Sequence, residues 1–136
     1  MRTPLLLIVA ALAFPVLAAI PPQRPDDLQK NATHIVAGKV VAVYATEVPL
    51  DREGMTNRLY AIEVTVTKAE KGEGLAEGKV VFAKCWTPAK RPRGWAGGQG
   101  QNKVPAAGET GKLYLAQQAD GTYTVLSPNG WAPEGK

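Results

Sequence analysis

Residues 58–68 read RLYAIEVTVTK, and this stretch decides the fold class. Tyr60, Ile62, Val64 and Val66 are aromatic or aliphatic, and the residues between them are mostly polar or small. In an extended chain, successive side chains point to opposite faces. The period of two therefore predicts a β-strand with one buried face and one face in contact with solvent.

Outward from this stretch, four further segments have the character of strands. The β-branched run at residues 34–48 contains Gly38, which indicates a strand that bends or bulges. Lys84 leaves open which face of the next predicted strand is buried. The last two strands are joined by Ala119-Asp120-Gly121, a strong hairpin signal. The predicted strands in this group are residues 34–48, 79–86, 112–118 and 122–126.

These segments predict an all-β protein, a small five-stranded barrel that is closed or nearly closed. Residues 87–111 have no regular period and form a long loop between the third and fourth strands. A short N-terminal helical turn is expected to end at Asn31, with Asp26 and Asp27 capping its amino end. Residues 128–131 are expected to end the fold with a turn. A two-layer sandwich is the alternative, although five strands are few for two packed sheets.

The chain begins with a stretch typical of a secretory signal. Arg2 is followed by an apolar run, and small residues precede a cleavage point after Ala18. The run is shorter than the roughly 20 residues that a membrane span needs, and Pro21 and Pro22 follow it. We expect a signal peptide at 1–18, a Pro-rich segment at 19–30, and a β-barrel domain at 31–136 of a secreted or periplasmic protein. A retained membrane anchor is the alternative.

Positive charge is concentrated in residues 84–103, KCWTPAKRPRGWAGGQGQNK, which hold five basic residues, no acid and two tryptophans. The net charge of the whole chain is +4, so without these five residues it would be slightly acidic. Cationic side chains attract anions, and an indole offers a flat face to a sugar, a base or a proline. The predicted ligand-binding residues are Trp86, Lys90, Arg91, Arg93, Trp95 and Gln101. The alternative is that the two tryptophans cover an open end of the barrel.

Residues that support catalysis are few. The chain has one serine, one histidine and one cysteine: Ser127, His34 and Cys85. Ser127 and His34 form no recognisable nucleophile–base motif, and one His with one Cys cannot supply a typical zinc site. A lone cysteine in a strand is usually a small buried hydrophobe. We therefore expect no catalytic residue, no metal and no cofactor.

Two other features are given structural interpretations. The glycine-rich run at residues 94–100 lacks the Gly-Lys-Ser/Thr ending of a phosphate loop, so its glycines serve chain flexibility. Four carboxylates show no spacing that selects a catalytic pair and are expected at the solvated surface: Asp51, Glu53, Glu63 and Glu109.

Three segments together resemble the netrin-module, or TIMP-like, OB-fold group. NATHIVAGKV at residues 31–40 is similar to that group's opening A-D-x-V-V-x-G-x-V pattern. YAIEVTV at 60–66 followed by Lys71-Gly72, and Gly108-Glu109 followed by LYL at 113–115, are similar to its later strands. The resemblance implies an OB-like barrel. Protease inhibition in the animal members needs a cysteine at the mature amino terminus, which this chain lacks, so that activity is not implied.

A second resemblance is to a family of secreted bacterial proteins with a C-W…K-R-P-x-G-W-x-G…G-Q…P…G stretch and a final P-N-G. Here the matching residues include Cys85-Trp86, 90–95, Gly97-Gly98, Gly100-Gln101 and 128–130. It implies export but no particular activity. We expect a non-enzymatic binding module that engages an anionic glycan or an acidic protein through the basic-aromatic loop. The alternatives are an inhibitor of a secreted hydrolase and single-stranded nucleic-acid binding, which secretion disfavours.

Overall fold

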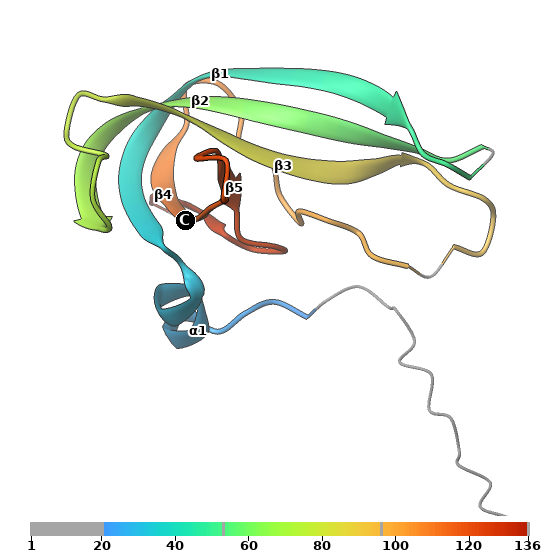
Figure 1. Ribbon diagram of the computed structural model, residues 1–136, viewed down its shortest axis with the longest axis horizontal. Coiled ribbons are helices and arrows are strands. Elements are labelled where there is room, and N and C mark those ends of the chain that lie inside the picture. Colours follow the sequence, from blue (N-terminus) through green and yellow to red (C-terminus); the bar gives the residue numbers. More distant parts are fainter. Residues whose placement is uncertain (1–20, 53, 96, 136) are drawn as a thin grey trace, which may run out of the picture.

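In the computed structural model of the protein, the alternating stretch lies within β2 (Thr56–Lys71), between β1 (His34–Pro49) and β3 (Val80–Lys90) (Figure 1). Ile62, Val64 and Val66 are buried, with at most 1% of their surface exposed. The residues between them are partly exposed. The predicted strand with one buried face is confirmed, and it is longer than predicted at both ends.

The sheet closes into a barrel. The structure describes residues 21–52, 54–95 and 97–135; the predicted signal peptide at 1–18 and Glu53 lie outside these ranges. The remaining strands are β4 (Thr110–Gln117), β5 (Tyr123–Val125) and β6 (Trp131–Pro133). The sheet order is β1-β2-β3-β5-β4-β6, and β1 also pairs with β4. Only the β3–β5 pair is parallel within the described ranges. Strands β1 to β5 close the barrel and β6 adds one strand beside β4, which confirms the predicted small OB-like barrel.

The long first strand bends as predicted at Gly38. The register between β1 and β2 shifts between Ala37 and Gly38, as it does at two neighbouring positions. A Cβ on Gly38 would lie 2.5 Å from Val64 Cγ1 and 2.7 Å from the carbonyl oxygen of Thr65. Only glycine lets the two strands approach this closely, and the bend lets β1 pair with both β2 and β4.

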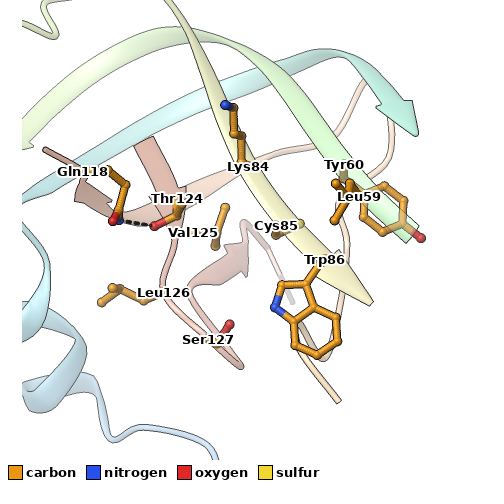
Figure 2. A pocket seen from close by; sticks show the side chains of 10 residues that line it. All are labelled: Leu59, Tyr60, Lys84, Cys85, Trp86, Gln118, Thr124, Val125, Leu126 and Ser127. Carbon is orange, nitrogen blue, oxygen red and sulfur yellow. Dashed lines mark hydrogen bonds between the residues drawn. The ribbon is translucent and has the colours of Figure 1, made fainter. Parts of the chain in front are cut away.

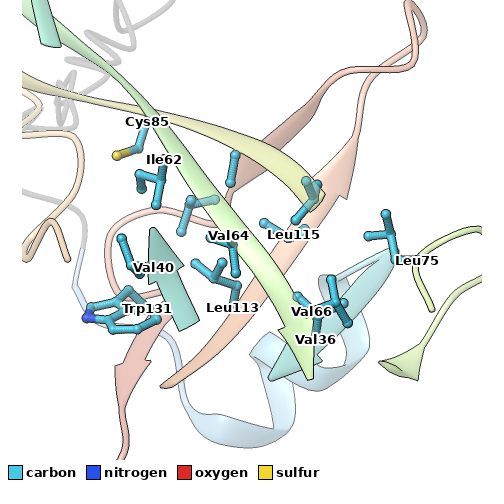
Figure 3. Close-up of a cluster of buried hydrophobic side chains, with 13 residues drawn as sticks. Val36, Val40, Ile62, Val64, Val66, Leu75, Cys85, Leu113, Leu115 and Trp131 are labelled. Carbon is cyan, nitrogen blue, oxygen red and sulfur yellow. The ribbon is translucent and has the colours of Figure 1, made fainter. Parts of the chain in front are cut away.

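The core fills the inside of the barrel (Figure 3). Val40, Leu113 and Leu115 have no exposed surface, and Cys85 is 9% exposed. On β3, the even-numbered residues from Val80 to Lys84 face outward, which resolves the ambiguity that Lys84 leaves in the sequence. Burial raises the pKa of the Cys85 thiol to about 12, as befits the inert buried cysteine that we predicted.

The last strand, β6, is not predicted by the sequence pattern, which indicates only a turn at residues 128–131. Trp131–Pro133 pairs with residues 111–113 of β4. Three residues are too few to display a period. Trp131 is 4% exposed and packs into the core beside Val40 (Figure 3).

The predicted helical turn is α1 (Pro25–Asn31), and one detail of its prediction is wrong. Asp26 and Asp27 do not cap it: the N-cap residue is Arg24, which makes no side-chain capping bond. The two carboxylates lie instead in the first turn, where they interact favourably with the helix dipole. Among the described residues, no helix has the length and apolar character needed to cross a membrane.

The long loop is shorter than predicted. Residues 87–90 belong to β3, because they continue its pairing with β2, and β4 begins at Thr110. The loop is held to β3 and to the chain after β5 by backbone hydrogen bonds from Gln101 N to Trp86 O (2.9 Å) and from Asn102 N to Pro128 O (2.7 Å). Val104 then packs against the core.

Candidate functional site

Three strands extend past the barrel as an arm, which we define as residues 44–49 of β1, 56–60 of β2 and 85–90 of β3 (Figure 1). Pairing of β1 with β4 ends at Lys39, and pairing of β3 with β5 ends at Lys84. In the arm, β2 therefore has a partner on each side, whereas β1 and β3 each pair with β2 alone. The basic loop, which we define as residues 90–103, begins at the last residue of β3.

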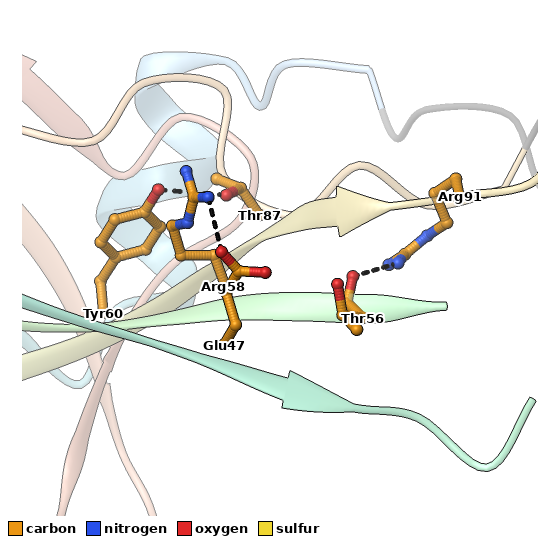
Figure 4. Close-up of polar contacts among 6 residues, drawn as sticks. All are labelled: Glu47, Thr56, Arg58, Tyr60, Thr87 and Arg91. Carbon is orange, nitrogen blue, oxygen red and sulfur yellow. Dashed lines mark hydrogen bonds and ion pairs between the residues drawn. The ribbon is translucent and has the colours of Figure 1, made fainter. Parts of the chain in front are cut away.

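Arg91 fixes the start of the basic loop to the arm (Figure 4). Its Nη1 donates to the carbonyl oxygens of Thr56 (2.5 Å) and Lys90 (2.8 Å), and its Nη2 donates to Asn57 Oδ1. The guanidinium carbon lies 5.6 Å from the centroid of the Trp95 ring, within the range of a cation–π contact. Three of the five Arg91 N–H groups are therefore used inside the protein, while Nε is buried with no hydrogen-bond partner among the described residues.

Lys90 and Arg93, on either side of Arg91, are exposed. Among the described residues, the two ion pairs found are Arg58–Glu47, which lies on the arm (Figure 4), and Lys112–Glu70, each at 2.9 Å. Within that part of the chain, no carboxylate neutralises Lys90 or Arg93. Lys90 and Arg93 are therefore presented to solvent next to the Arg91 guanidinium, which holds the base of the loop in place, and Lys103 further along the loop is exposed as well.

The other predicted loop residues are less accessible. Trp95 is half-buried, and its Nε1 is shielded from solvent. Gln101 is 4% exposed, and its backbone N–H holds the loop to Trp86. Gln101 therefore holds the loop in place through its backbone, and its buried side chain is not accessible to a partner in this structure. Neither Trp86 nor Trp95 belongs to the core cluster.

Trp86 lines a cleft of about 490 Å³ between β3 and the chain that follows β5 (Figure 2). The cleft exists because β3 and β5 pair at only two positions, Ala83–Tyr123 and Lys84–Thr124, and then diverge. Its volume is in the range of small-molecule sites. Gly100, at φ +68°, lies against the Trp86 ring, where a Cβ would come within 2.8 Å of the indole.

The cleft has an apolar middle and polar ends. Cys85 and Val125 lie between Trp86 at one end and Gln118 at the other (Figure 2). Gln118 Nε2 donates to Thr124 Oγ1 (2.9 Å), which orients the amide. The ammonium group of Lys84 points away from the other side chains in this view. The lining residues come from several separate segments, so only Trp86 was identified from the sequence.

The outer face of β1, β2 and β3 exposes Tyr44, Leu59 and Phe82, which the sequence analysis also missed. Tyr44 donates a hydrogen bond to Glu63 Oε1 (2.8 Å), and this bond raises the pKa of the phenol. Phe82 and Trp86 are both even-numbered residues of β3 and lie on the same side of the strand. The alternating pattern therefore predicts that Phe82 is exposed, but only once the buried side of β3 is known.

His34 and Ser127 do not form a catalytic pair. His34 is buried, with Nε2 2.8 Å from the carbonyl oxygen of Glu73 and Nδ1 2.9 Å from Thr33 Oγ1. Both ring nitrogens are thus bonded to groups other than Ser127, so the imidazole is not placed to activate that serine. Within residues 21–52, 54–95 and 97–135, no group of three or more His, Cys, Asp or Glu side chains is arranged to hold a metal.

Comparison of the chain with protein-family models, with curated proteins and with solved structures finds no match. The netrin-module and bacterial-family resemblances stay predictions. A function for this protein therefore has to be argued from the loop, the arm and the cleft.

Proposed function

We propose that the protein is a secreted or periplasmic, non-enzymatic binding module that engages an anionic partner through its basic loop. The observation that carries this proposal is the exposed position of Lys90 and Arg93 beside the Arg91 anchor. No described carboxylate competes for these two cations. An anionic glycan is the partner class that best fits an exported protein with an indole next to its cations.

The anchor supports this function because it lowers the entropy lost on binding. A long loop that must become ordered around its ligand loses affinity, whereas a loop already held in place does not. Arg91 fastens the loop to two residues of β2, and Gln101 fastens it to Trp86 on β3. Exposed charge pairs are screened by salt, so binding should weaken as ionic strength rises.

The test is retention on immobilised heparin, used as a probe of anionic glycans. Lys90→Ala/Arg93→Ala should elute at lower salt and bind about five- to thirtyfold more weakly, since each exposed charge contact contributes about 0.5–1 kcal/mol. The matched control, Lys30→Ala/Lys39→Ala, removes two exposed cations elsewhere and should be retained like the wild type. If both variants lost the same amount of retention, binding would depend on net charge and not on this site. If the loop variant were retained like the wild type, the site would be refuted.

A further inference from the structure

The β3–β5 cleft is a built feature of this barrel, because it follows from where the sheet pairing stops. Parallel pairing of β3 with β5 ends at Lys84 and Thr124, and the chain after β5 moves away through Leu126 and Ser127. The core residue Cys85 is therefore left at the bottom of a cleft of about 490 Å³. A cleft of this size that reaches core side chains has the dimensions of a small-molecule site.

The chemistry of the lining selects the kind of ligand. The middle, at Cys85 and Val125, is apolar, and the Trp86 indole provides an aromatic surface (Figure 2). The Ser127 hydroxyl and the amide of Gln118 supply hydrogen-bonding groups toward the ends. The ten lining residues include no carboxylate, and the one cation among them points its charge elsewhere.

A sugar ring matches this combination. Its C–H face packs on an indole, and its hydroxyls both donate to and accept from amide and hydroxyl groups. A hydrocarbon chain would offer no hydrogen bond to the Gln118 amide oxygen or to the Ser127 hydroxyl, which costs binding free energy. Charge in the ligand has to lie outside the cleft, because inside it no ionised group compensates the loss of solvent.

The cleft is continuous with the basic loop along one strand. Trp86 and Lys90 are four residues apart on β3, which corresponds to about 13 Å of extended chain. A ligand held against Trp86 thus has exposed cations within the length of a few sugar units. Gly100 and Gln101 connect the two regions directly, since both contact Trp86.

We propose that the cleft binds one ring of an anionic oligosaccharide, with that ring packed on Trp86, and that the anionic groups of the neighbouring units meet Lys90 and Arg93. This inference rests on the proposed function and makes it more specific. The loop provides charge attraction, and the cleft provides recognition of the sugar itself.

The experiment is calorimetric titration of the full-length protein with a hyaluronan tetrasaccharide, in which uncharged N-acetylglucosamine rings alternate with anionic glucuronate rings. Trp86→Leu removes the aromatic surface, and Thr124→Phe fills the cleft from β5; each should lower the affinity about tenfold or more. Phe82→Leu removes an exposed aromatic from the same strand outside the cleft and should change the affinity less than twofold. Circular dichroism establishes that each variant is folded, and either cleft variant alone suffices for the test.

The outcomes separate this inference from the proposed function. If both cleft variants bind like the wild type while Lys90→Ala/Arg93→Ala binds weakly, the cleft assignment is wrong and the charged site stands. If no variant changes the affinity, both proposals fail. Oligo(dT) titrated under the same conditions should bind more weakly than the tetrasaccharide. Equal or tighter binding of oligo(dT) that is lost in the cleft variants would overturn the assignment to sugar.

Discussion

Arg91 should act as the anchor of the basic loop and not as a charge for the ligand. Its two bonds to β2, at Thr56 O and Asn57 Oδ1, join residues that lie about 35 positions apart in sequence. In a half-buried setting each contributes about 1 kcal/mol, and the contact with Trp95 adds about 0.5–1 kcal/mol. Arg91→Ala should therefore weaken loop attachment by about 2–3 kcal/mol.

Amide hydrogen exchange measures this attachment directly. The Gln101 and Asn102 amides bond to Trp86 O and Pro128 O, so they exchange only when the loop opens. Loosening by 2 kcal/mol raises their exchange rate about thirtyfold, provided that local opening dominates the exchange.

Arg91→Lys is the informative control, because lysine keeps the charge but lacks the planar fork that bonds Thr56 and Asn57 together. The Arg91→Lys variant should lose most of the protection from hydrogen exchange that the Gln101 and Asn102 amides lose in Arg91→Ala. Arg93→Ala, at an exposed position, should leave protection unchanged. The anchor role would be refuted if Arg91→Ala also left the Gln101 amide as protected as in the wild type.

Two further predictions concern the barrel. Gly38→Ala should lower the free energy of unfolding in urea by about 2 kcal/mol, since the new Cβ would meet the backbone of Thr65; Gly98→Ala, which meets no atom within 4 Å, is the control, and equal effects would contradict this account. The pKa of Cys85, raised to about 12 from the usual 9.0, means that above pH 9 the unfolded chain releases a proton that the folded protein keeps. The stability that the thiol contributes is thus complete below pH 9 and declines above it, approaching about 1.4 kcal/mol per pH unit up to pH 12. Thermal unfolding of wild type and Cys85→Ala across this range tests it, and parallel pH profiles would rule it out.

The strands were predictable where the alternation of apolar and polar residues continues over several residues. The alternation through Ile62 and Val64 fixes both the element and its buried face, because the pleat puts every second residue on one side. On β3 the same rule predicted a strand but not its orientation, since Lys84 interrupts the outward apolar face between Phe82 and Trp86. β6 has too few residues to carry any pattern.

The candidate site was only partly predictable for a different reason. The sequence shows that residues 84–103 collect cations and indoles, and Trp86 does line the cleft. The sequence does not distinguish Arg91, Arg93 and Gln101 from one another. In the fold, Arg91 anchors the loop, Arg93 is exposed and Gln101 is buried. Those differences depend on contacts with β2 and with the chain after β5. These contacts join residues far apart in sequence, so a short stretch of sequence does not reveal them.

By itself, then, the chain determined a β-rich barrel, a bend at Gly38 and a cationic segment, because these follow from backbone sterics and from composition along contiguous residues. Tertiary structure alone decided which cations face solvent, and it opened a cleft at the point where β3 and β5 stop pairing. Contacts between residues far apart in sequence set both, and such contacts exist only once the sheet has closed.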